Sequence, residues 1–129
     1  MKNLSLLCLG VALLLSTKIA FADEECDKYN NSYDVTYCYC KLFIESDKEL
    51  NAVYKELKTA LKDNLKKQLT EVQRDWMTYR NSACEEEGTI DVDCNYQVNK
   101  ERTEYLRDRL RECKTGNTRE DMILKKSWE

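Results

Sequence analysis

The sequence predicts an all-α fold: a small disulfide-stapled domain with a long helix, an antiparallel partner helix, and short N- and C-terminal helices. The 129 residues include no proline, and only two of the three glycines lie after residue 22. Such a chain is poor in turn residues and rich in helix formers. Apolar residues also recur every three or four positions from Leu50 to Ala83, which is the period of a helix with one buried face.

Residues 1–22 have the features of a secretory signal peptide. Lys2 supplies a positive start, residues 4–15 are an apolar run too short to span a bilayer, and residues 20–22 have a small-x-small cleavage pattern. A retained membrane anchor is the alternative. We therefore expect an exported protein, periplasmic or secreted, with residues 23–129 forming one domain that is not membrane-bound after cleavage.

The long helix is expected over residues 47–86. Ser46 and Glu49 have the spacing of a capping box, in which the serine caps the first turn and the glutamate reaches back. Gly88 should end the helix, because glycine adopts the left-handed cap conformation without penalty. Asp63 and its neighbour have the lowest helix propensity in the stretch, which makes them the candidate position for a bend.

The flanking elements have weaker signals. Ser32 is placed to cap a short N-terminal helix, although the segment after it also has strand propensity. Asp91 or Asp93 should cap the partner helix, which is expected to end before Gly116. Residues 118–128 are expected either to form a last short helix that packs or to be a loose tail.

Six cysteines follow the predicted signal peptide, and an even number in a small exported chain predicts three disulfides. They are Cys26, Cys38, Cys40, Cys84, Cys94 and Cys113. Cys84–Cys94 is the favoured pair, since an antiparallel helix hairpin brings these two positions together. One of Cys38 and Cys40 should pair with Cys26, and the other with Cys113. Without histidine or paired C-x-x-C motifs, no metal site is expected.

Charge and composition exclude several function classes. Without Lys2 and Lys18 the chain has 19 basic and 24 acidic residues, a net charge of −5. This mild acidity argues against nucleic acid or an anionic membrane as partner. Catalysis and cofactor binding are not expected, because histidine, glycine-rich phosphate loops and metal motifs are all missing from the sequence. A redox role for Cys38 and Cys40 is disfavoured by their C-x-C spacing.

Several motifs resemble the bacterial LprI-type lysozyme inhibitor family. The most specific is Gln73-x-x-Trp76-x-x-x-Arg80-x-x-x-Cys84, and further matches are Asp47, Leu50, Asn51, Tyr54, Leu69, Cys94, Thr103 and Arg107. The likeness covers about Cys26 to Leu110. It implies a small exported helical domain with disulfides and, in at least one branch, inhibition of lysozyme. Cys40 and Cys113 depart from the family pattern, which suggests one additional bridge.

Two surfaces are candidates for binding a partner. Gln73, Trp76 and Arg80 share one helical face, which is either a recognition surface or part of the core. The second is an acidic rim around the predicted hairpin turn, which is either an inhibitory loop for a basic, cleft-bearing enzyme or a solvated helix end. Its residues are Glu85, Glu86, Glu87, Asp91 and Asp93.

The leading hypothesis is an exported inhibitor that binds the cleft of a basic lysozyme-type muramidase, a partner class implied mainly by the resemblance. The alternative is a non-catalytic envelope adaptor that binds another surface protein through Trp76 and Arg80. Salt sensitivity discriminates between them, since charge-steered binding weakens at high ionic strength much more than an apolar interface does.

Overall fold

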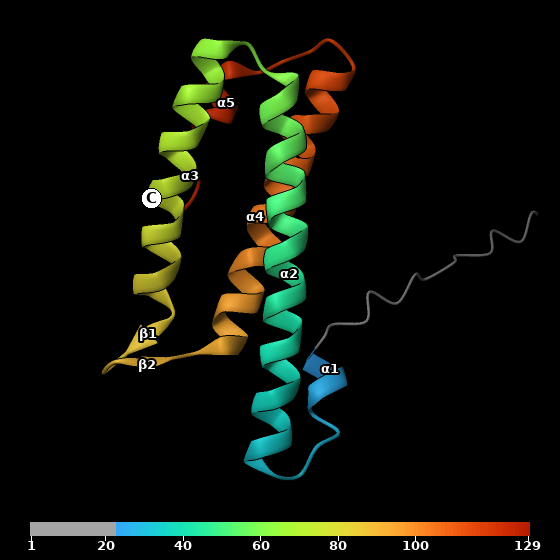
Figure 1. Cartoon of the computed structure of the whole chain (residues 1–129), viewed down its shortest axis with the longest axis vertical. Coiled ribbons are helices and arrows are strands. Elements are labelled where there is room, and N and C mark those ends of the chain that lie inside the picture. Colours follow the sequence, from blue (N-terminus) through green and yellow to red (C-terminus); the bar gives the residue numbers. More distant parts are fainter. Residues whose placement is uncertain (1–22) are drawn as a thin grey trace, which may run out of the picture.

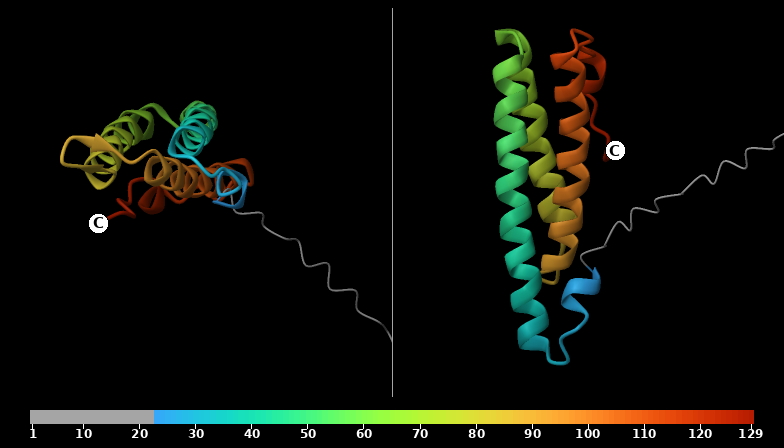
Figure 2. Two further views of the ribbon diagram at one scale, coloured as in Figure 1. Left: turned by 90° about the horizontal axis from the view of Figure 1, so that it is seen from below. Right: turned by 90° about the vertical axis from the view of Figure 1, so that its right-hand side faces the viewer.

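The computed structural model describes residues 23–129, so the predicted signal peptide lies outside the described residues. Three long helices form an up-down-up bundle (Figure 1), and the end-on view in Figure 2 shows them side by side. They are α2 (Ser32–Ala60), α3 (Asp63–Ala83) and α4 (Val92–Lys114). Short helices α1 (Asp23–Cys26) and α5 (Glu120–Ile123) flank them, and strands β1 (Glu85–Glu86) and β2 (Thr89–Ile90) join α3 to α4. The prediction of a predominantly helical, disulfide-bonded fold is confirmed.

The predicted single helix over residues 47–86 is wrong, because the chain reverses at Leu61 and Lys62 between α2 and α3. The apolar spacing continues through this reversal, so periodicity alone did not reveal it. A straight helix of this length would leave most of its apolar face in water. Folding back lets Leu57, Leu61 and Leu65 share one core.

The start of α2 also differs from the prediction. The proposed capping box at Ser46 is wrong: this residue lies inside α2, and its hydroxyl donates to the Phe43 carbonyl at 2.8 Å. The helix begins at Ser32, and the side chain of Asn31 caps it by accepting from the Asp34 amide at 2.9 Å. The short N-terminal helix expected from Ser32 is therefore the first part of a 29-residue helix.

The core lies between the three long helices and is closed at one end by α5. Its buried members are Leu50, Val53, Leu57, Leu61, Leu65, Leu69, Trp76, Leu106, Leu110 and Ile123. Each fully buried leucine of this kind stabilises the fold by roughly 1.5–3 kcal/mol relative to exposure. Burial of Ile123, with Trp128 packed against the same cluster, confirms that the C-terminal segment packs.

The two glycines after residue 22 have different roles. Gly116 has a φ of 76° and follows Thr115, the C-cap of α4, so this helix ends before Gly116 as predicted. Gly88 also has a φ of 76°, but it lies in the turn between β1 and β2, so its prediction as a helix end is wrong. At the start of α4, Asp91 is the cap, since its side chain accepts from the Cys94 amide at 3.0 Å.

Two disulfides form in the structure, Cys26–Cys38 and the predicted Cys84–Cys94. Cys40 and Cys113 have free thiols, so the expected third bridge is not present. The cause is the parallel course of α2 and α4. Lys114 pairs with Glu56, which places Cys113 about 24 Å along the bundle from Cys40 at 1.5 Å per residue.

Candidate functional site

The β1–β2 hairpin is an exposed feature that joins α3 to α4. Its strands are antiparallel, with Glu85 opposite Ile90 and Glu86 opposite Thr89. Glu87 and Gly88 form the turn with φ values of 50° and 76°, the left-handed pair that a type I′ turn requires. Figures 1 and 2 show the hairpin projecting beyond the ends of α3 and α4.

The base of the hairpin is held by covalent and hydrogen bonds. The Cys84–Cys94 disulfide joins the end of α3 to the first turn of α4. The Asp91 amide donates to the Cys84 carbonyl at 2.9 Å, which adds a further rung below the strand pairing. A loop restrained in this way loses little conformational entropy when it docks into a partner.

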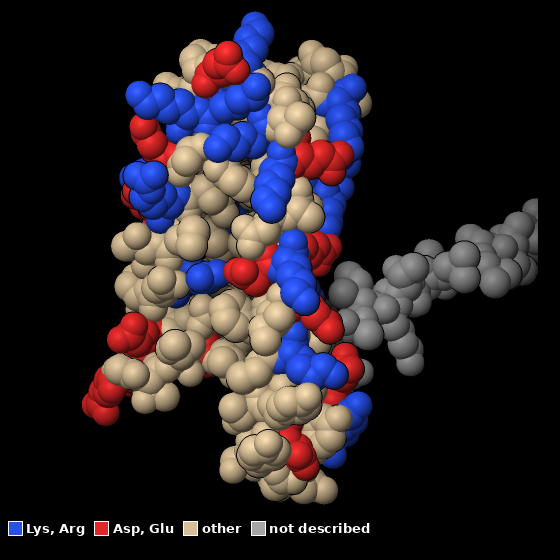
Figure 3. Space-filling view, viewed as in Figure 1, with Lys and Arg blue, Asp and Glu red and all other residues tan. Residues whose placement is uncertain are grey.

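The hairpin side chains face solvent: three are acidic, Thr89 is polar and Ile90 is apolar. All residues from Glu85 to Ile90 are exposed, and Ile90 is 65% exposed. In Figure 3 the acidic side chains lie at this tip, while lysines and arginines gather at the opposite end of the same face. The hairpin therefore presents three carboxylates and one large apolar side chain together.

The two aspartates predicted for the rim differ from the three glutamates. Asp91 is exposed, but its side chain is engaged as the α4 cap. Asp93 is half-buried and accepts a hydrogen bond from Gln97 at 3.3 Å. Both belong to the root of the hairpin and the start of α4 rather than to its tip.

The second candidate surface, the face of Gln73, Trp76 and Arg80, lies inside the bundle. Trp76 is only 3% exposed and Arg80 only 9%. Gln73 is buried and accepts a hydrogen bond from Arg102 of α4 at 3.1 Å. This burial favours the core interpretation of the face over the recognition interpretation.

A hollow of about 230 Å³ lies at the root of the hairpin, and the sequence did not indicate it. Phe43 of α2, Arg80 and Asn81 of α3, and Ile90 line it together with residues of the disulfide region. Phe43 is far away in sequence, so only the folded bundle brings it to this position. The sequence could have indicated Ile90 as a site residue, since it is an apolar residue within an acidic, turn-forming segment.

The sequence over the hairpin and the helices before it is similar to a known protein family. The family model described as lysozyme inhibitor LprI matches residues 20–106, well over half of the chain. The chain belongs to the LprI lysozyme inhibitor family. No curated protein and no solved structure matches it. The LprI match includes the hairpin and the Cys84–Cys94 bridge, and it ends within α4.

LprI membership bears on role, partner and location. A family of inhibitors supports a general role in lysozyme inhibition rather than catalysis, with a protein partner such as lysozyme. Together with two disulfides, it is consistent with an extracellular or periplasmic location. Within residues 23–129, no helix has the length and apolar character needed to cross a membrane. The same residues contain no cluster of three or more metal-binding side chains.

Proposed function

We propose that the protein inhibits a basic lysozyme-type muramidase by inserting the β1–β2 hairpin into the mouth of its substrate cleft. The observation that carries this proposal is the restrained, projecting hairpin, which combines Glu85, Glu86 and Glu87 with the exposed Ile90. Family membership supports lysozyme as the partner.

The charges define how the hairpin docks. Muramidases hold two catalytic carboxylates in the cleft, so the floor of the cleft repels further acids. The hairpin glutamates therefore contact basic groups on the rim, and Ile90 packs against the apolar surface on which a sugar ring normally lies. Long-range attraction between an acidic tip and a basic enzyme raises the association rate and aligns the two molecules.

The experiment measures binding and inhibition as a function of salt. The oxidised mature protein is titrated against a basic lysozyme by calorimetry, with lysis of cell walls recorded in parallel. Glu86→Gln/Glu87→Gln should weaken binding about tenfold or more at low salt, because two rim contacts are lost. The wild-type protein should lose affinity steeply between about 0.05 and about 0.5 M salt, and the variant much less.

Glu71→Gln/Glu120→Gln is the matched control, because both residues are exposed acids outside the hairpin and the change in net charge is the same. We expect it to bind within about twofold of wild type, since distant surface charges are largely screened. An equal loss of binding affinity in the two variants would show a general effect of net charge and not a binding site on the hairpin. Inhibition that survives in both variants would also contradict the proposal. The buried positions of Trp76 and Arg80 give no support to the adaptor alternative.

A further inference from the structure

Arg102 of α4 is a buried cation with two unsatisfied nitrogen atoms. The residue is 3% exposed. Its Nε donates to Gln73 Oε1 at 3.1 Å, whereas Nη1 and Nη2 are buried and have no hydrogen-bond partner among the described residues. Buried donors are nearly always satisfied in native proteins, so an orphaned pair on one guanidinium requires an explanation.

The surroundings of this guanidinium are aromatic rather than acidic. Its central carbon lies 5.1 Å from the ring centroid of Trp128, 5.4 Å from that of Tyr105 and 5.9 Å from that of Trp76. Rings stacked on the faces of a guanidinium stabilise its charge but leave the N–H edges unused. Burial lowers the pKa of Arg102 to about 10, so the group is still cationic at neutral pH.

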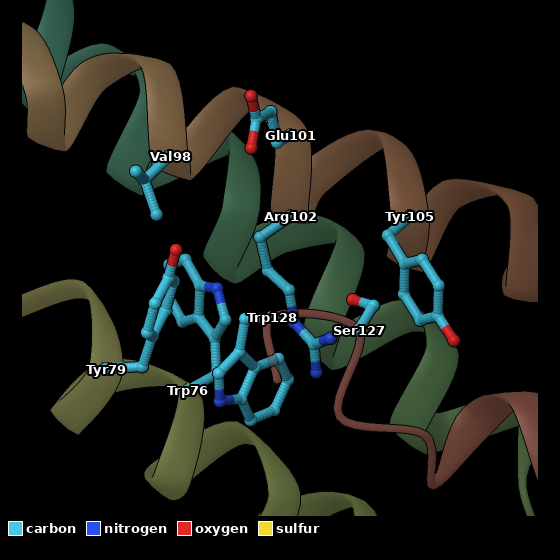
Figure 4. Close-up of a pocket in the computed structure, with 8 residues that line it drawn as sticks. All are labelled: Trp76, Tyr79, Val98, Glu101, Arg102, Tyr105, Ser127 and Trp128. Atoms are coloured by element: carbon cyan, nitrogen blue, oxygen red, sulfur yellow. The ribbon is translucent and has the colours of Figure 1, made fainter. Parts of the chain in front are cut away.

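A pocket of about 180 Å³ lies beside the Arg102 side chain, between α3, α4 and the C-terminal segment. Figure 4 shows Arg102 reaching from α4 into this space, with Trp128 and Tyr105 on either side. Tyr79 and Trp76 of α3 form another wall, and Tyr79 stacks on Trp128 with the ring centroids 6.1 Å apart. Ser127 and Trp128 lie beyond the family match, which ends at residue 106.

We infer that this pocket binds a small aromatic monocarboxylate, whose carboxylate pairs with Nη1 and Nη2 of Arg102 and whose ring packs against Trp76 and Trp128. Two parallel N–H groups on a planar fork match the two oxygens of one carboxylate. The volume also fits, since an apolar cavity of about 150 Å³ accommodates a benzene ring. Glu101 also lines the pocket, and its negative charge disfavours a dianion such as phosphate.

Entry to the site involves the C-terminal segment. Both Nη atoms are covered in this structure, and the Trp128 ring is the nearest aromatic cover. Trp128 is only half-buried and belongs to the chain end that follows the short helix α5. A modest shift of its indole exposes the guanidinium fork, and the ring can then close over the ligand.

The test uses benzoate as the probe and the whole mature protein. Heteronuclear NMR follows the Arg102 Nε–H and the two indole N–H signals during titration. Benzoate should shift these three signals saturably and raise the melting temperature, since a ligand of the native state stabilises it. Benzamide, the neutral isostere, should bind about tenfold more weakly or worse, because it lacks the charge-assisted pair. Phenylphosphonate should bind more weakly than benzoate, because Glu101 disfavours a dianion in the pocket.

Two variants complete the test. Arg102→Lys keeps the charge but loses the fork, and it should weaken benzoate binding by about tenfold. Arg111→Lys is the matched control on the same helix, where the arginine is exposed and paired with Asp108, and its benzoate affinity should be unchanged. If Arg102→Lys does not fold, the shift of the Arg102 Nε–H signal in the wild-type protein tests whether benzoate binds beside this residue.

Three results would overturn the inference. The first is the absence of a shift at Arg102 Nε–H with benzoate present at saturating concentration. The second is equal affinity for benzoate and benzamide, which would mean an apolar cavity without a role for the guanidinium. The third is a set of shifts confined to surface lysines and arginines, which would identify an adventitious additive only. None of these readouts depends on lysozyme, so they are independent of the hairpin proposal.

Discussion

Arg80 connects the three long helices through a single guanidinium. It belongs to α3, and its Nη1 donates to Asp47 of α2 and to Asn99 of α4, each at 3.1 Å. Asn99 is fully buried and donates in turn to the hydroxyl of Ser46 at 3.1 Å. The network therefore supplies polar contacts that fix the register of α2, α3 and α4 at one level of the bundle.

Replacement of Arg80 by methionine tests this network. Asp47 is partly exposed and can regain water, but the side-chain oxygen of Asn99 loses its partner in the core. We expect Arg80→Met to lower the free energy of unfolding by about 1–3 kcal/mol, which is the desolvation penalty of a buried unsatisfied polar group. Urea unfolding followed by circular dichroism measures this difference.

Arg74→Met is the control, since Arg74 is an exposed residue of the same helix. Its effect should stay within about 0.5 kcal/mol. An Arg80 variant as stable as the Arg74 variant would mean that the network is dispensable for the fold.

At the residue scale, the sequence correctly put Gln73, Trp76 and Arg80 on one helical face, because helical spacing depends only on position along the chain. It did not decide whether that face is inside or outside. The answer depends on α4, which supplies Arg102 and Asn99 as partners for Gln73 and Arg80. These contacts join residues 19 to 29 positions apart, beyond the reach of local patterns.

At the scale of elements, the Cys84–Cys94 bridge is the constraint that shapes the hairpin. Removing a disulfide that closes a loop of this length should lower the free energy of unfolding by about 2–3 kcal/mol. Cys84→Ala/Cys94→Ala should also speed amide hydrogen exchange in residues 85–90, because the strands are only two residues long and cannot hold the loop alone.

The comparison for that variant is Cys40→Ala, which removes a free, half-buried thiol without opening a ring. Its unfolding free energy should change by less than about 1 kcal/mol. Hairpin exchange rates that are the same in both variants would mean that strand pairing, and not the disulfide, restrains the loop.

The reversal at Leu61 and Lys62 shows why element boundaries were only partly predictable. The weak helix propensity at Asp63 indicated the correct position, but it predicted a bend where the chain turns back completely. Without glycine or proline at the turn, local sequence carries no sign of a full reversal. Burial of Leu61 in the turn itself, within the shared core, favours the compact arrangement.

The molecule as a whole is organised by the parallel course of α2 and α4. This course separates the free thiols of Cys40 and Cys113 toward opposite ends of the bundle. We therefore expect alkylation of an oxidised protein of residues 23–129, followed by peptide mass spectrometry, to label Cys40 and Cys113 and no other cysteine of that range. A bridge between these two in the monomer would require a different helix arrangement, since disulfide Cα atoms lie within about 7 Å of each other.

The sequence predicted the helical class and the Cys84–Cys94 pair, because composition, period and helix ends are local properties. It did not predict three long helices with α2 parallel to α4, and so it wrongly paired Cys113 with Cys38 or Cys40. The acidic tip was visible in the sequence as a run of glutamates. The sequence did not predict that a two-stranded hairpin carries these glutamates.

The position of the Cys84–Cys94 bridge affects how the protein withstands proteases. Exposed loop tips are preferred cleavage sites, and the hairpin is a projecting loop in which every residue from 85 to 90 is exposed. A single cut between residues 85 and 93 leaves the fragments covalently joined through sulfur, with α2 and α3 on one side and α4 on the other. The nicked molecule keeps its packed bundle, and its two fragments separate on a gel only after reduction.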